Sequence, residues 1–337
     1  MTPLFSNPAP LSALGSVLTA FCLSVVVNLL LTSHRLRHLA TDQPNARSLH
    51  QHPTPRLGGL GILAGTLTAQ AIGPHWPTAW QLAVGLLAGI SLADDFRPLA
   101  PLLRLAVHGA CAGLAAQPLL ADGSGWVIAA AVLTTVWAVN LFNFMDGANG
   151  LAGGMGTIGF AWLAVVAWQG NSSLAWFCLS LSAACAGFLC FNFGQARIFM
   201  GDIGSTLLGL MAAMIGIVGI SERLWPAWLP AMVFLPFIAD ASSTLLRRLL
   251  GCQRFWLPHR EHHYQKLVRM GWSHTRLALH AYLLMLGCGA LAILIRGQDH
   301  AIVITCWLAL LAFCGIIGAM IQARWNSFAR QNPQQAR

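Results

Sequence analysis

Apolar runs long enough to cross a lipid bilayer recur along this chain, and they constrain its fold more than any other feature. A membrane-spanning helix needs about 20 predominantly apolar residues, and we expect about eleven such segments here. Their approximate bounds are 11–31, 57–73, 79–93, 102–120, 126–144, 153–169, 174–191, 203–220, 226–244, 277–295 and 301–321. Only 9% of the residues are charged, whereas soluble domains carry about 25%. The sequence therefore predicts an all-α integral membrane protein, with one polytopic domain over residues 1–337.

The basic residues predict the orientation of these segments in the membrane. Arg56, Arg197 and the arginines between 247 and 276 fall on one side, whereas Arg223 and Arg296 fall on the other. Because basic residues concentrate in cytoplasmic loops, we expect a periplasmic N-terminus and a cytoplasmic C-terminus. The expected cytoplasmic loops are about 32–56, 94–101, 145–152, 192–202 and 245–276. The net charge of +9 is thus explained by topology, and we expect no nucleic-acid partner.

Most of the ten acidic residues fall on the same predicted cytoplasmic side, whereas Asp122, Glu222 and Asp299 fall in short external turns. Asp94 and Asp95 are adjacent at the end of an apolar run, and Asp146 and Asp202 also fall at predicted helix ends. An aspartate at the bilayer centre costs about 2.5–3.5 kcal/mol on insertion scales, and a helix end costs less. A transporter or proton pump would place acids near the midplane. The pattern therefore favours a reaction at the cytoplasmic membrane face over a conduction path.

Polar residues also interrupt the stretch "NLFNFMDGANGLAGG". Asn140, Asn143 and Asp146 recur every third residue, so on a helix they form one polar stripe. Gly147 and Gly150 would then let the backbone approach a ligand. Two amides and a carboxylate in an apolar span are costly without partners, which favours a binding site over a simple polar helix end.

Two further stretches carry candidate site residues. Asp202 lies between glycines in "FMGDIGSTLLG", where a helix cap or a turn would be an alternative role. The stretch "PHREHHYQKL" groups histidines with an arginine. Zinc binding would require more convincing ligand spacing than this loop offers, and arginine beside histidine suits phosphate recognition better.

This combination of groups predicts phosphate chemistry assisted by a divalent cation. Magnesium usually takes one or two carboxylates together with phosphate oxygens of a substrate, and manganese could substitute for it. A site at the lipid interface allows one substrate to be a lipid phosphate. Two unit charges 4 Å apart repel by about 4 kcal/mol at an effective dielectric of 20, so a metal and arginines would be needed. We therefore expect a transfer between a nucleotide-type donor and a lipid phosphate.

The order of five stretches resembles a known enzyme family. "HPTPRLGGLGI", "ADDFRPLAP", "NLFNFMDGANGLAGG", "FMGDIGSTLLG" and "HREHHYQKL" are similar to motifs of the polyprenyl-phosphate N-acetylhexosamine-1-phosphate transferases. The histidine loop looks most like the branch that initiates O-antigen synthesis. The resemblance implies eleven helices in a bacterial inner membrane. It also implies transfer of an N-acetylhexosamine-1-phosphate, or a 6-deoxy derivative, from a UDP-sugar to undecaprenyl phosphate. UMP would be released.

The resemblance also implies roles for individual residues. Asp94 and Asp95 would be catalytic, and Asp202 would bind Mg²⁺. The implied substrate-binding residues are Arg56, Asn140, Asn143, Asp146, Asn149, Asn192, His259, Arg260, His262 and His263. The loop 251–276 would determine which sugar the enzyme accepts. Two features depart from the family pattern: the acid-free "FRP" follows the aspartate pair, and Asn149 stands where many relatives have aspartate.

Other functions remain alternatives at the level of the sequence. A flippase or transporter for the same lipids would share the membrane topology but would transfer nothing. Prenyltransferases and phosphatidyltransferases of the CDP-alcohol type need more aspartates at fixed spacing than this chain offers. The sequence leaves open whether the protein forms a homodimer.

Overall fold

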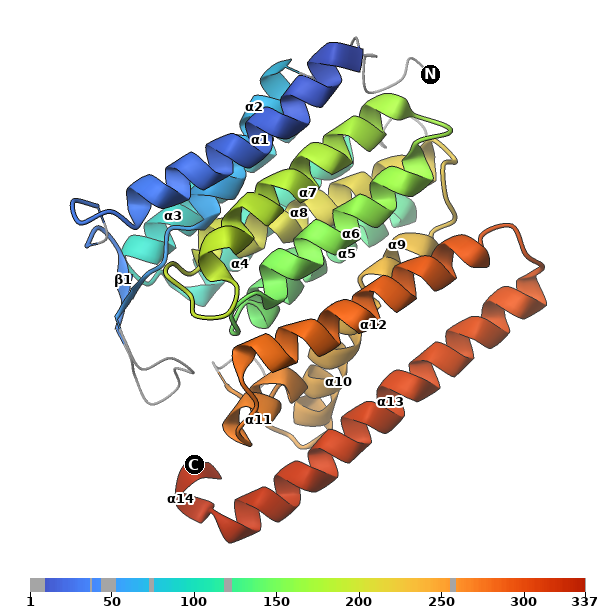
Figure 1. Ribbon diagram of the computed structural model, residues 1–337. Coiled ribbons are helices and arrows are strands. Elements are labelled where there is room, and N and C mark those ends of the chain that lie inside the picture. The colour runs from blue at the N-terminus through green and yellow to red at the C-terminus, as the bar shows by residue number, and fades with distance from the viewer. Residues whose placement is uncertain are drawn as a thin grey trace.

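The computed structural model describes residues 10–36, 38–43, 53–72, 76–117, 123–254 and 259–336, and it is almost wholly helical (Figure 1). Parts of two predicted cytoplasmic loops, 44–52 and 255–258, lie outside the described residues. The elements are α1 (Pro10–Leu31), β1 (Thr41–Asp42), β2 (Thr54–Pro55), α2 (Gly59–Ile72), α3 (Thr78–Phe96), α4 (Pro101–Ala116), α5 (Gly125–Met145), α6 (Leu151–Ala167), α7 (Ser172–Asn192), α8 (Gly201–Ser221), α9 (Trp228–Val233), α10 (Leu235–Leu250), α11 (His263–Arg269), α12 (His274–Leu294), α13 (His300–Gln331) and α14 (Pro333–Ala336).

Helix α8 forms the centre of the bundle. It packs against α2, α3 and α5, while α1, α2, α6 and α7 pack against one another beside it. Within its most apolar stretch, 89% of the residues are buried. A Cβ on Gly209 would lie 2.3 Å from the carbonyl oxygen of Ala138, so glycine permits the close approach of α5 and α8. Because α8 is enclosed, the polar residues at its start are held in a fixed place.

The predicted apolar segments each contain a helix. Among the described residues, six helices are long and apolar enough to cross a membrane: α1, α5, α7, α8, α12 and α13. Helices α4 and α6 are apolar but shorter, with 16 and 17 residues. The described chain is therefore a helical integral membrane protein, as the composition predicted. The number of eleven crossings stays a prediction.

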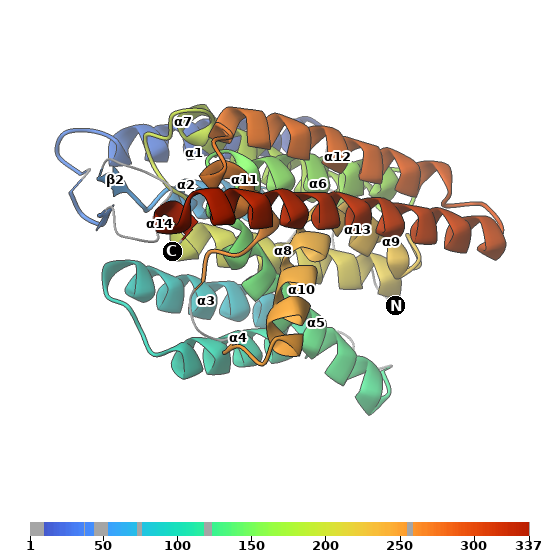
Figure 2. The ribbon, with the colours of Figure 1, turned by 90° about the horizontal axis from the view of Figure 1, so that it is seen from below.

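The segment predicted as one helix at 226–244 differs in the structure. It is divided at Phe234 into the six-residue α9 and the 16-residue α10. Pro236 stands in the first turn of α10, where its missing N–H needs no partner, but it cannot continue the preceding helix. As a result α10 runs across the direction of the neighbouring helices (Figure 2). Its basic end then reaches α11 and α13.

Helix α13 is longer than the span predicted at 301–321. Its 32 residues correspond to about 48 Å at 1.5 Å per residue, whereas the hydrocarbon core is about 30 Å thick. It lies at the edge of the molecule beside α12, and it contacts α10 and α11 (Figure 1). One end of α13 therefore extends beyond the thickness of the hydrocarbon core.

Candidate active site

Two aspartates from distant parts of the chain meet where α3 ends and α8 begins. Asp94 lies in the last turn of α3, and Asp202 lies in the first turn of α8. Arg104 of α4 reaches both: its Nη1 lies 3.0 Å from Asp94 Oδ2 and 3.3 Å from Asp202 Oδ2. The backbone N–H of Leu99 donates to Asp94 Oδ1 at 2.6 Å. One guanidinium thus holds together two of the carboxylates that the sequence predicted to share a site.

Asp95 has a different environment from its neighbour Asp94. Its side chain is only 1% exposed, and it accepts hydrogen bonds from the backbone N–H groups of Asp202, at 3.0 Å, and Ile203, at 3.2 Å. The first N–H groups of a helix lack intrahelical partners and favour a negative charge. One turn earlier, Ser91 Oγ lies 2.9 Å from Thr206 Oγ1. Asp95 therefore fastens the end of α3 to the start of α8.

Arg56 completes this junction from the strand β2 side. Its guanidinium donates to the carbonyl oxygens of Asp94, at 3.1 Å, and Asp95, at 2.9 Å. Gly201, the first residue of α8, has φ of +73°, and a Cβ there would lie 2.1 Å from the Arg56 carbonyl oxygen. Glycine is therefore required at this position, and Arg56 lies directly against the aspartate pair.

The polar stripe of α5 reaches the same place only in part. Asn143 Nδ2 lies 3.4 Å from Asp202 Oδ2, so this residue joins the carboxylate cluster. Asn140 Nδ2 instead donates to the Val136 carbonyl at 2.7 Å and lies 3.5 Å from His108 Nδ1 of α4. The predicted stripe therefore spreads over two neighbouring environments, and Asn143 is the member nearest to Asp202.

Asp146 follows α5 and lies close enough to Asp202 and Asp95 to interact with them electrostatically. Burial, together with the nearby charges of Asp202 and Asp95, raises the pKa of the Asp146 carboxyl well above its ordinary value. Such mutual repulsion is what a bound cation would relieve. Within the described residues, no group of three or more His, Cys, Asp or Glu side chains is arranged to hold a metal ion. Magnesium needs only one or two carboxylates when substrate oxygens complete its shell, so Asp202 and Asp94 fit that ion.

Asn149 and Asn192 support the loops beside the cluster. Asn149 Nδ2 donates to the Gly194 carbonyl at 2.8 Å. Asn192 is buried: its Oδ1 accepts from Gly150 N–H at 2.7 Å, and its Nδ2 donates to the Ile198 carbonyl at 2.9 Å. Gly150 has φ of +79°, a conformation that favours glycine. Both amides therefore hold backbone turns in the structure, and their predicted contacts with substrate stay predictions.

The predicted histidine loop docks onto the end of α5. His262 stacks on Phe144 with ring centroids 6.0 Å apart, and the Tyr264 hydroxyl donates to the Phe144 carbonyl at 2.9 Å. Asp240 of α10 accepts from the N–H groups of His263, at 2.8 Å, and Tyr264, at 3.0 Å. Because Phe144 follows Asn143, the histidine loop packs against the same end of α5 that carries Asn143.

The other members of the histidine loop face different neighbours. His263 Nε2 lies 3.3 Å from Ser243 Oγ. His259 stacks near His262, with centroids 5.0 Å apart. Burial, and then the positive charges of His262 and the neighbouring basic residues, lowers the pKa of His259 to about 4. His259 is therefore neutral at pH 7. Arg260 lines a separate pocket with Lys266.

Sequence reasoning missed Arg104, and it placed Asp240 on the cytoplasmic side without giving it a role in the site. A signal for Arg104 is visible in "PLLRLAVHG", where a lone arginine follows three apolar residues inside a predicted span. A charged residue in such a span requires a partner. Asp240 is likewise a lone charged residue, near the end of the apolar run in "LPFIADASS".

Helices long enough to cross a membrane, with carboxylates, amides and an arginine gathered at their ends, define a polytopic membrane protein with an enzyme-like polar site. Residues 78–220 match the Glycosyl transferase family 4 profile. This region includes α3 to α8, and with them Asp94, Asp95, Arg104, Asn143 and Asp202.

Similarity to known proteins extends over most of the chain and agrees with this match. The chain is 30% identical over 323 residues to the "Probable undecaprenyl-phosphate N-acetylglucosaminyl 1-phosphate transferase" of Bacillus subtilis, covering 87% of each chain. It is 30% identical over 300 residues, 72% of each chain, to the "Decaprenyl-phosphate N-acetylglucosaminephosphotransferase" of Mycobacterium tuberculosis. It is 28% identical over 304 residues, 82% of this chain and 76% of the other, to the "Undecaprenyl-phosphate alpha-N-acetylglucosaminyl 1-phosphate transferase" of Yersinia pestis.

The chain belongs to glycosyl transferase family 4. It is a membrane transferase of the sugar-phosphate type, and the family predicted from its five motifs is confirmed.

Proposed function

We propose that this protein transfers N-acetylglucosamine-1-phosphate from UDP-N-acetylglucosamine to undecaprenyl phosphate. The products are undecaprenyl-diphosphate-N-acetylglucosamine and UMP. The names of the Bacillus and Yersinia relatives support this sugar and this lipid. The reaction would take place at the cytoplasmic face of a bacterial inner membrane, as the first membrane step in making a cell-surface polysaccharide.

One observation carries the proposal: Arg104 joins Asp94 and Asp202 at the meeting point of three helices. Carboxylates suit a divalent cation, and a guanidinium suits phosphate oxygens. A reaction that brings a lipid phosphate to a nucleotide diphosphate needs both kinds of group. The cluster also stands at helix ends, where a lipid phosphate at the membrane surface could reach it.

Magnesium is the cofactor we propose, with manganese as a substitute. Asp202 would hold the ion, with Asp94 beside it, and Asn143 would orient the Asp202 carboxylate through its amide. When bound, the ion would offset the charge of the donor's diphosphate and stabilise the leaving UMP.

We propose that Asp94 acts on the lipid phosphate. Leu99 N–H holds its Oδ1, so its Oδ2 faces Arg104. We propose that Asp94 accepts any remaining proton and orients the phosphate, while Arg104 binds its oxygens. An oxygen of the lipid phosphate then attacks the β-phosphorus of the donor. The bond from that phosphorus to the bridging oxygen breaks, and UMP leaves with the bond's electron pair.

A covalent route is the alternative mechanism. Asp94 would attack the β-phosphorus first, and the lipid phosphate would then resolve the aspartyl adduct. We favour direct attack because a phosphate monoester with a second pKa near 6 is largely dianionic at neutral pH and needs positioning more than activation. A donor with a chiral phosphorothioate at the β-phosphorus distinguishes the two routes by the configuration of the product. Inversion supports direct attack, whereas retention or a trapped adduct on Asp94 would overturn it.

The region between the end of α5 and the histidine loop is our proposal for donor recognition. Asn143, Asp146 and His262 would contribute to it, and the loop 251–276 would distinguish one sugar from another. His263 extends this region toward Ser243 of α10, whereas Arg260 lines the separate pocket that contains Lys266.

The activity can be tested in membranes that contain this protein and undecaprenyl phosphate. After incubation with UDP-N-acetylglucosamine labelled in the sugar, label should move to the lipid fraction and UMP should appear. A flippase or transporter for the same lipids would give neither product, so a negative result with folded protein would favour that alternative.

A further inference from the structure

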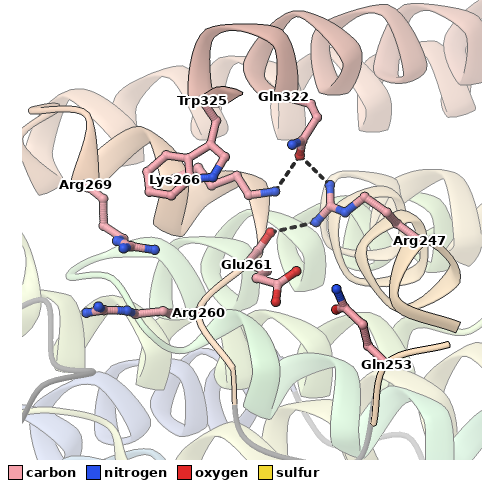
Figure 3. Close-up of a pocket in the computed structure, with 8 residues that line it drawn as sticks. All are labelled: Arg247, Gln253, Arg260, Glu261, Lys266, Arg269, Gln322 and Trp325. Atoms are coloured by element: carbon pink, nitrogen blue, oxygen red, sulfur yellow. Dashed lines mark hydrogen bonds between the residues drawn. The ribbon is translucent and has the colours of Figure 1, made fainter. Parts of the chain in front are cut away.

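A pocket separate from the Asp94–Asp202 cluster lies between α10, α11 and the end of α13 (Figure 3). Its volume is about 390 Å³, within the range of about 300–1,000 Å³ for small-molecule sites. The lining residues are Arg247, Gln253, Arg260, Glu261, Lys266, Arg269, Gln322 and Trp325.

Positive charge dominates this pocket. It has four cationic side chains and one carboxylate, Glu261, and that carboxylate is already paired with Arg248. The amide oxygen of Gln322 accepts from Lys266 Nζ at 2.6 Å and from Arg247 Nη1 at 2.7 Å (Figure 3). Because an amide oxygen carries no full charge, it orients these two cations without neutralising them. The pocket is therefore complementary to an anion.

The position of the pocket along α13 places it at the level of lipid headgroups. Gln322 is separated from His300, the first residue of α13, by 22 positions, or about 33 Å at 1.5 Å per residue. That length is close to the thickness of a hydrocarbon core, about 30 Å. After "GAM" the helix becomes polar, with Gln322, Arg324 and Trp325, and tryptophan is enriched at the membrane interface.

The aromatic ring of Trp325 also orders one of the cations. The guanidinium carbon of Arg269 lies 4.5 Å from the centre of this ring. A cation at this distance is attracted to the face of the ring, so Trp325 helps to hold the Arg269 guanidinium in the lining of the pocket. In Figure 3, Arg269 and Arg260 lie at the left of the pocket and Arg247 at the right, and Lys266 extends from below Trp325 toward Gln322.

We propose that this pocket binds the phosphate headgroup of an anionic glycerophospholipid of the surrounding bilayer. Basic pockets between helices on the cytoplasmic side recognise such headgroups, and α13, which forms one wall, is mostly exposed along its apolar length. The bound lipid would join α13 to α11, the helix that follows the His262 loop. This proposal does not depend on the transfer reaction. If lipid binding at the pocket is refuted, the proposed reaction is unaffected, and the reverse also holds.

Native mass spectrometry of the full-length protein tests the proposal. Protein released from bilayers that contain equal amounts of phosphatidylglycerol and phosphatidylcholine should retain phosphatidylglycerol preferentially. The double substitution Lys266→Gln with Arg269→Gln should weaken this retention by about 30-fold, since each cation near the surface is worth about 1 kcal/mol. Arg324→Gln, which removes an exposed arginine of the same helix outside the pocket, is the matched control and should retain the lipid.

Two further measurements make the outcome decisive. Arg269→Lys keeps the charge and should keep most of the retention, which separates loss of charge from loss of fold. Binding of UDP-N-acetylglucosamine, undecaprenyl phosphate and inorganic phosphate is measured on the same variants. Equal retention of phosphatidylglycerol by the double variant and the wild type would overturn the proposal. A double variant that keeps phosphatidylglycerol but loses one of the other three ligands would overturn it as well.

Discussion

The carboxylate cluster and the basic pocket have opposite charge imbalances. In the cluster, Asp94 and Asp202 share the single guanidinium of Arg104. In the pocket, four cationic side chains surround Glu261 alone. The first region therefore needs a cation to become balanced, and the second needs an anion. The difference indicates that one set of helix ends presents two sites, which recognise ligands of opposite charge.

The two regions nevertheless use the same device to fix their geometry. Asp95 accepts hydrogen bonds from two N–H groups in the first turn of α8, and Asp240 accepts from two in the first turn of α11. Both carboxylates are at most 11% exposed. In each case a buried carboxylate satisfies helix N–H groups that would otherwise lack partners. The chain therefore uses some of its few acids for positioning and leaves others to meet substrate.

Removing the charge of Asp202 should have the largest effect on the carboxylate cluster. Asp202→Asn should lower transfer by about 100- to 1,000-fold, because loss of the metal's carboxylate removes charge stabilisation of the reacting diphosphate. The dependence of the remaining activity on magnesium concentration should weaken. Initial rates over a magnesium titration check this, and an unchanged titration curve would refute Asp202 as the ligand.

Asp94→Asn should be nearly as damaging but through a different step. We expect a loss of about 100-fold in turnover, with binding of UDP-N-acetylglucosamine retained, because Asp94 acts on the lipid phosphate. Calorimetric binding of the donor and steady-state kinetics with both substrates separate these effects. Loss of donor binding with normal saturation by lipid would contradict the assignment.

Asp95→Asn should affect the fold more than the chemistry. An amide supplies one acceptor in place of two, so a buried helix N–H loses its partner, which costs about 1–3 kcal/mol. The melting temperature of Asp95→Asn should fall below that of Asp94→Asn. At low temperature, however, Asp95→Asn should be more active than Asp94→Asn. If Asp95→Asn is fully stable but inactive, Asp95 has a chemical role that the hydrogen bonds do not reveal.

Exchange of residues 251–276 with those of a relative that uses another sugar tests whether sugar recognition is separate from the carboxylate cluster. The preference among UDP-sugars should follow the loop, whereas the dependence on Asp202 should be unchanged. Competition between labelled UDP-sugars measures this preference. An active chimera with the original preference would place sugar recognition elsewhere.

The smallest expected effect concerns pH and the basic pocket. Burial, and then the charge of Arg247, lowers the pKa of Lys266 to about 8, while Glu261 and Asp240 act in the opposite direction and Arg269 adds to the lowering. Lys266 is therefore mostly charged at pH 7 and mostly neutral at pH 9. Since one cation is worth about 1 kcal/mol, phosphatidylglycerol retention should weaken about five-fold between these values. Lys266→Gln should abolish the change.

Much of the fold could be predicted because a bilayer restricts what its helices can be. Apolar length located the long helices but not the short α11 and α14, and the acids at helix ends indicated where the site lies. The break at Phe234 was missed because the apolar run continues through the prolines. Partners of Asp95 and Arg104 were also missed, since the contact of Asp95 with Asp202 spans 107 residues. Sequence spacing carries no information about such contacts, which only the packing of α3, α4 and α8 creates.

The most direct test of the central claim follows the β-phosphate of the donor. Purified protein is incubated with undecaprenyl phosphate, magnesium and UDP-N-acetylglucosamine labelled with ³²P at the phosphate attached to the sugar. We predict that label enters the lipid fraction in equal amount to UMP released, and that Asp202→Asn gives almost none. Release of labelled UDP, or intact donor with folded wild-type protein, would contradict transfer of a sugar-phosphate at this site.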